Sequence, residues 1–170
     1  MAIVTQPLRD EHKDLWPHVE VLRTTADSVG EVPMEMLRRT VDEAYDFLAR
    51  HLIPHAQAEE RALYPVVQKV MGAAEATATM SRDHVEVGRL TEELSALRRP
   101  LAGAASITTP QAKALRRVLY GLYALVKVHF AKEEEVYLPL LDAHLTPAEA
   151  QRMFEAMEQA AKEAKGALPA

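Results

Sequence analysis

The chain of 170 residues contains no cysteine. Disulfides, thiolate metal sites, iron–sulfur clusters and cysteine nucleophiles are therefore excluded, and any bound metal must be held by nitrogen and oxygen. The six glycines are scattered, and neither a glycine-rich phosphate loop nor a GxSxG nucleophile motif occurs. These absences count against most of the common enzyme classes.

The chain also carries little excess charge and has no long apolar run. Its net charge is −5 and its pI is near 5.8, so we expect neither a nucleic acid nor a membrane as a partner. No apolar run approaches the ~20 residues that span a bilayer, and the first residues lack the apolar core and cleavage site of a secretory signal. We therefore expect a cytoplasmic protein that is a monomer or a homodimer.

Helix-forming residues dominate the sequence. Their apolar spacing predicts an all-α protein with five helices, over about residues 7–29, 33–70, 75–99, 110–144 and 146–166. Four long helices joined by short connections predict an up-down-up-down four-helix bundle over residues 1–145. The short fifth helix, within residues 146–170, begins with a capping box formed by Thr146 and Glu149. We expect it to pack across the bundle or against a partner.

Three prolines, Pro17, Pro54 and Pro65, fall inside the predicted helices. Each removes one backbone hydrogen bond and favours a bend. Two interpretations are open. The prolines simply kink helices around a core, or a local bulge re-aims the side chains beside them.

The sequence contains an internal repeat. The segment HAQAEERALYP, which begins at His55, aligns without a gap with HFAKEEEVYLP, which begins at His129. An acidic residue followed by a histidine precedes each copy, at His12 and at His84. The chain therefore reads as two helical hairpins, each offering one histidine from its first helix and an HxxxE motif from its second.

The HxxxE spacing predicts metal ligands. Residues four apart lie on one face of an α-helix, so His55 with Glu59, and His129 with Glu133, can each reach one ion. A single HxxxE is usually a solvated ion pair, but two copies in register on facing helices are how bundles build dinuclear sites. Histidines with carboxylates and no thiolate suit iron, with manganese or zinc open on ligand type alone.

Further carboxylates lie beside these motifs. We expect Glu60, Glu134 and Glu135 to form the outer, solvated face of the helices. Glu134 is a reserve ligand if the helix is locally distorted.

Four segments in this order, DEHKDL, HAQAEERALYP, RDHVEV and HFAKEEEVYLP, resemble the hemerythrin-like (HHE) cation-binding family over roughly residues 7–144. The resemblance implies a cofactor of two non-haem iron ions, with an oxo or hydroxo bridge between them as an open alternative. It also implies that the ligands are His12, His55, Glu59, His84, His129 and Glu133.

The sequence departs from the oxygen-carrying hemerythrins, which have two histidines four apart in the third helix and HxxxxD in the fourth. Here Gly88 lies four residues after His84, and an extra histidine, His51, lies four residues before His55. This difference counts against reversible oxygen carriage and makes His51 a candidate fifth histidine ligand.

Two other side chains near the motifs have open roles. His18 lies about 120° from His12 around an unkinked helix, which places it outside the ligand set unless Pro17 rewinds that turn. Tyr64 is either a packing residue or a phenolate ligand to ferric iron.

The resemblance implies a protein that binds or reacts with dioxygen, hydrogen peroxide or nitric oxide. Peroxide disproportionation and a role in oxidative or nitrosative stress are the activities to test, and whether the protein is an enzyme stays open. The alternative is an iron or oxygen sensor or store without turnover. Such a protein acts through metal-dependent stability and a separate partner.

Overall fold

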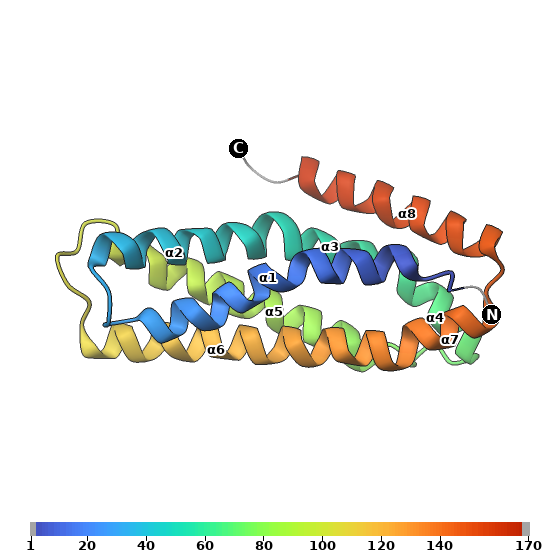
Figure 1. Cartoon of the computed structure of the whole chain (residues 1–170), viewed down its shortest axis with the longest axis horizontal. Helices are drawn as coiled ribbons and strands as arrows, with labels where there is room; N and C mark the ends of the chain where they lie inside the picture. Colours follow the sequence, from blue (N-terminus) through green and yellow to red (C-terminus); the bar gives the residue numbers. More distant parts are fainter. Residues whose placement is uncertain (1–2, 168–170) are drawn as a thin grey trace.

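The structure, a computed structural model, describes residues 3–167 and is helical throughout (Figure 1). Four helical rods form its body, and two of them are built from several consecutive segments. The rods are α1 (Gln6–Ser28); α2 (Met34–Phe47), η1 (Leu48–Leu52), α3 (Ile53–Ala58), η2 (Glu59–Leu63) and α4 (Tyr64–Met71); α5 (Ala78–Arg98) with a short 3₁₀ turn, η3 (Arg99–Leu101); and α6 (Thr109–Lys132), η4 (Glu133–Tyr137) and α7 (Leu138–His144).

A fifth helix, α8 (Pro147–Gly166), follows these rods. No strand occurs in the described residues, so the predicted all-α class is confirmed. The ends of the predicted helices differ from the observed ends by only a few residues.

Consecutive rods run in opposite directions (Figure 1). Helix α1 lies beside α2 and α6, and α5 contacts the same two helices, so the four rods surround one interior. Helix α8 folds back over the second rod, where it contacts α3 and η2. None of the helices within residues 3–167 combines the length and hydropathy needed to cross a membrane.

Local sequence explains where several helices begin and end. Thr146 and Glu149 form the predicted capping box at the start of α8, and Thr108 and Gln111 form another before α6. Each pair satisfies two backbone N–H groups that a helix start leaves free. Gly72 ends α4 with a φ of +67°, a left-handed conformation that glycine adopts without steric cost.

The segments η1, η2 and η4 are single π-helical turns, and a proline follows each of them. Proline lacks an N–H group, and its ring collides with the carbonyl four residues earlier, so the wider turn accommodates it. A bulge therefore forms at Pro54 and Pro65, whereas Pro17 lies within the uninterrupted helix α1. The residue before each proline donates its N–H to the carbonyl five residues earlier: Ile53 to Leu48, Tyr64 to Glu59, and Leu138 to Glu133.

The interior consists of two apolar clusters separated by a polar layer. One cluster fills the half of the bundle between α1, α2, α5 and α6, and includes Val19, Leu48 and Leu122. The other includes Leu8 and Leu138, and it joins the opposite ends of the rods to α8. On all four rods, histidines and glutamates lie between members of the two clusters. These side chains are His12, His55, Glu59, His84, His129 and Glu133, and all of them except His84 are buried.

Asp142 in α7 holds the start of α1. Its carboxylate accepts hydrogen bonds from the Thr5 backbone N–H at 2.9 Å and the Thr5 hydroxyl at 3.0 Å, and it pairs with Arg9 at 3.3 Å. Burial opposes the charge, but the bonds from Thr5 and Arg9 lower the pKa of Asp142 below its ordinary value.

We expect Asp142→Ala to lower the free energy of unfolding at pH 7 by about 1–3 kcal/mol, because it removes hydrogen bonds to a charged group. Urea denaturation measures this, with both proteins in the same metal-loading state. The folded-state pKa is depressed, so the difference should shrink as the pH falls below the ordinary value of 3.8. The exposed Asp14→Ala in α1 is the control. A loss no larger than that of the control would contradict the role of Asp142.

Candidate metal centre

Six side chains from all four rods meet in the polar layer. The histidines are His12 from α1, His55 from α3, His84 from α5 and His129 from α6. The carboxylates are Glu59 and Glu133, the first residues of the π turns η2 and η4. Each therefore lies where its helix widens before a proline. Both carboxylate side chains are fully buried.

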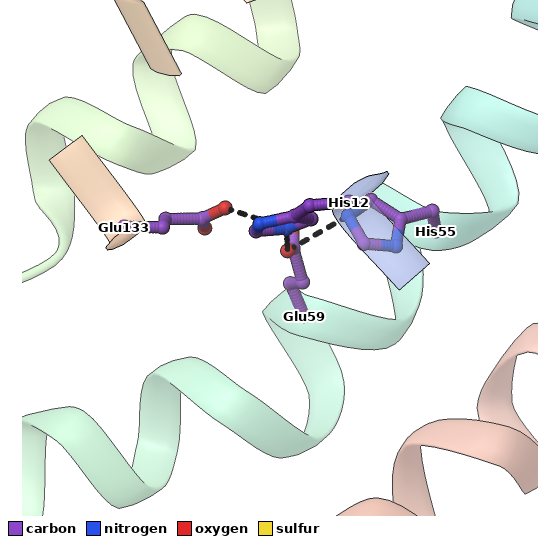
Figure 2. A group of neighbouring side chains, drawn as sticks. All are labelled: His12, His55, Glu59 and Glu133. Carbon is purple, nitrogen blue, oxygen red and sulfur yellow. Dashed lines mark ion pairs between the residues drawn. The ribbon is translucent and has the colours of Figure 1, made fainter. Parts of the chain in front are cut away.

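Four of these side chains form the first group, shown in Figure 2. One potential ligand atom each from His12, His55, Glu59 and Glu133 lies within 4.8 Å of all the others. The Nε2 atom of His55 is 3.0 Å from Glu59 Oε1. The Nε2 atom of His12 is 3.8 Å from Glu59 Oε1 and 3.4 Å from Glu133 Oε2. Two imidazole nitrogens and two carboxylate oxygens thus surround one point.

Glu59, His84 and His129 form the second group. Here Glu59 uses its other oxygen, Oε2, which is 3.2 Å from His84 Nε2 and 3.9 Å from His129 Nε2. Glu133 also turns its other oxygen, Oε1, toward this group, at 3.4 Å from His129 Nε2. Each carboxylate therefore lies between the two groups with one oxygen toward each, an arrangement that can bridge two cations.

The outer nitrogen of every histidine meets a further carboxylate. Because a carboxylate only accepts, each Nδ1 carries a proton, and in the neutral imidazole the lone pair is on Nε2, which faces inward. Such partners fix the orientation of metal-binding histidines and raise their basicity. The pairs are His12 with Glu134 (2.8 Å), His55 with Glu11 (3.0 Å), His84 with Glu60 (2.7 Å) and His129 with Asp83 (3.1 Å).

The sequence alone assigned Glu60 and Glu134 to the solvated face and kept Glu134 as a reserve ligand. Glu60 is exposed as expected, but the bonds of both carboxylates to the histidines were missed. Glu134 is partly exposed, and each of the two carboxylates accepts from a histidine of a neighbouring rod. Glu135 is exposed, as expected. The repeat contained the missed signal, because an acidic residue adjoins the ligand at equivalent places in both halves.

Several buried atoms of the centre lack hydrogen-bond partners. They are Nε2 of His12, Nε2 of His55, both oxygens of Glu59 and Oε2 of Glu133. In addition, the Nε2 atoms of His84 and His129 face each other at 3.0 Å. Lone pairs that converge in a dry interior cost free energy unless positive charge lies between them. This donor set of nitrogen and oxygen atoms therefore fits metal cations.

The same negative field acts on the histidines. Burial opposes their charged forms, but Glu133 and Glu59 raise the pKa of His12 to about 9 and that of His129 to about 10. Glu59 and Glu11 likewise raise the pKa of His55 despite its burial. The histidines in turn hold the pKa of Glu59 well below its usual range. A site that attracts protons so strongly attracts other cations for the same electrostatic reason.

Tyr64 distinguishes the two groups. Its hydroxyl donates to Glu133 Oε1 at 3.0 Å and lies 3.4 Å from the Nε2 atoms of both His84 and His129. Burial and the nearby carboxylates raise the pKa of Tyr64. The equivalent position in the other copy of the repeat is Leu138.

The first group has an aromatic cover instead. The Phe130 ring stacks on His12, with 4.3 Å between ring centroids. Its equivalent in the other copy of the repeat is Ala56. The ligands are therefore repeated, but their surroundings are not.

The structure does not bring His51 or His18 to the centre. His51 is exposed, and His18 is exposed and stacks on Phe47 at 5.3 Å, beside a surface groove that both histidines line. His51 lies in the π turn η1, whose wider turn alters the helical register relative to His55. The expectation of a fifth histidine ligand is therefore not supported, and His18 lies outside the ligand set as expected.

Comparison with curated proteins finds no match, and neither does comparison with solved structures. A family model, the hemerythrin HHE cation binding domain, matches residues 4–141. This span includes every residue of the metal centre and ends before α8. The chain therefore belongs to the hemerythrin HHE cation-binding domain family.

Proposed function

We propose that this protein holds two non-haem iron ions and uses them to bind or react with dioxygen, hydrogen peroxide or nitric oxide. One observation carries the proposal: the two groups of inward-facing donor atoms share Glu59 and Glu133. Each of these glutamates directs one oxygen toward the first group and the other oxygen toward the second. Bound iron would supply the redox chemistry and the coordination site for the oxidant.

The surrounding residues have separate tasks in this proposal. The four histidines and two glutamates hold the ions, and the outer carboxylates keep each Nε2 pointing inward. The apolar clusters on both sides restrict water, which favours a small ligand over an organic substrate. Tyr64 holds a proton on its hydroxyl beside the second group and can donate it to a ligand bound there. Peroxide disproportionation requires such a proton donor and a free coordination position.

We expect the purified protein to contain about two iron ions per chain, because six protein ligands with two bridges suit two ions. Metal analysis and an optical spectrum, before and after addition of peroxide, measure this. His129→Ala should lose most of the iron. The matched control His51→Ala removes an exposed histidine and should keep it.

Colourless protein with less than about one iron per chain would overturn the proposal. A phenolate-to-iron charge-transfer band that Tyr64→Phe lacks would place Tyr64 among the ligands. Rapid oxygen evolution from peroxide would support turnover.

We expect Glu60→Gln and Glu134→Gln each to weaken iron binding about 10–100-fold, because an amide holds the histidine Nδ1–H less strongly than a carboxylate does. Competition with a chelator gives the affinities. Glu135→Gln is the matched control, since Glu135 follows Glu134 directly but is exposed. Equal affinities in all three variants would show that the outer carboxylates do not support the centre.

A second function, that of a metal-dependent sensor or store, is favoured by the position of α8. This helix packs on α3 and η2, the segments that carry His55 and Glu59. Loss of the metal would leave several buried polar atoms uncompensated beneath it. A structural change in α3 and η2 on metal loss can then be transmitted through α8 to a separate partner protein.

In that case we expect chelation to lower the melting temperature markedly, because metal binding contributes to the stability of the fold. Differential scanning calorimetry of iron-loaded and chelated protein measures the shift, and peroxide consumption by the loaded protein measures turnover. A large shift without turnover favours the sensor or store. Rapid turnover with little change in melting temperature favours the enzyme.

A further inference from the structure

A cavity lies on the surface of the protein, away from the metal centre. Its volume is ≈ 590 Å³. This is within the range of about 300–1,000 Å³ that is typical of small-molecule pockets. Residues of η2, α4 and the first half of α8 line it, together with the connection before α8. Figure 1 shows this region at the end of the bundle where α4, α7 and the start of α8 meet. No residue of the metal centre lines the cavity.

The cavity has an apolar surface at its base. The side chains there come from η2, α4, α8 and the connection before α8, and they range from buried to partly exposed. They are Ala62, Val66, Val70, Leu145 and Met153. An apolar chain placed here would be removed from water, which stabilises binding.

The rim of the cavity is basic, although the chain as a whole carries a charge of −5. Arg61, Lys69 and Arg152 contribute three positive charges, against one carboxylate, that of Glu149. The Glu149 carboxylate already accepts from the Thr146 backbone N–H at 2.9 Å and the Thr146 hydroxyl at 2.7 Å. The Glu149 carboxylate therefore offsets the positive charge of the rim only in part.

Two of these cations are free to bind a ligand. Arg61 pairs with Glu163 at 3.0 Å, but within residues 3–167 neither Lys69 nor Arg152 forms an ion pair or a side-chain hydrogen bond. Lys69 lies on α4 and Arg152 on α8. Both line the same cavity, together with Glu149.

We propose that this cavity binds a small organic anion with an apolar tail, namely a carboxylate of the fatty-acid type. Its head group would lie between Lys69 and Arg152, and its chain would lie over Val66, Val70 and Met153. The concave shape and the volume of the cavity favour a small molecule over an extended peptide. Such a ligand contacts α4 and α8 at once, so its binding would also hold α8 against the bundle.

Decanoate, below the concentration at which it forms micelles, is the probe, and isothermal titration calorimetry on the full chain measures its binding. We expect a Kd of about 0.1–1 mM and no measurable binding of acetate. Lys69→Glu with Arg152→Glu should weaken binding at least about tenfold, by removing the attraction for the head group. Amide NMR shifts should map the ligand to α4 and the first half of α8.

The matched control is Arg39→Glu with Lys113→Glu. It makes the same change in net charge at exposed residues of α2 and α6, at the opposite end of the bundle. Circular dichroism verifies that both double variants fold. Lys69→Gln with Arg152→Gln provides a second, milder variant, for which an intermediate loss is expected.

Three results would overturn the proposal: no binding of decanoate, equal binding by the charge-reversed variant, or equal binding of decyltrimethylammonium. The last would show an apolar surface without charge selection. The titrations are made on both iron-loaded and iron-free protein. Protein that takes up no iron but still binds decanoate would contradict the proposed function and leave this inference intact.

Discussion

The structure depends on the compensation of charge inside a dry helical bundle. Four imidazoles and two carboxylates are placed between two apolar clusters, where each uncompensated ion costs several kcal/mol. Four outer carboxylates satisfy the Nδ1 side of the histidines. On the inner side, several nitrogen and oxygen atoms of the ligands lack hydrogen-bond partners. The bundle therefore preserves a cation-binding centre at a cost in stability that bound metal would offset.

The backbone around this centre is adapted to it. Two of the π turns begin at Glu59 and Glu133, and a proline ends each of these widened segments. The third, η1, precedes Pro54 and lies one turn before His55. The prolines thus make a regular α-helix unfavourable beside Glu59 and Glu133, which both lie in the resulting π turns. The widened turns accommodate residues that usually interrupt helices in the two rods that carry these carboxylates.

The centre is symmetric in its ligands and asymmetric in its surroundings. Phe130 covers His12, whereas the Tyr64 hydroxyl reaches into the group formed by His84 and His129. The two copies of the repeat share the ligand spacing but differ in the neighbouring packing residues, and a packing residue can be exchanged at less cost than a ligand can be moved. The two groups of donor atoms are therefore expected to differ in polarity. Helix α8 adds a further asymmetry, since it packs on the second rod.

The sequence by itself determined the all-α class, the helix limits and the repeated histidines and glutamates, because apolar periodicity and four-residue spacing are local properties. It did not reveal that Glu60 and Glu134 bind histidines of neighbouring rods, since residues 24 and 122 positions apart meet only in the folded bundle. It also misplaced His51, because the π turn at that residue changes the helical register on which the expectation rested. Only the tertiary structure decided which donor atoms converge, because convergence depends on how four rods pack around one point.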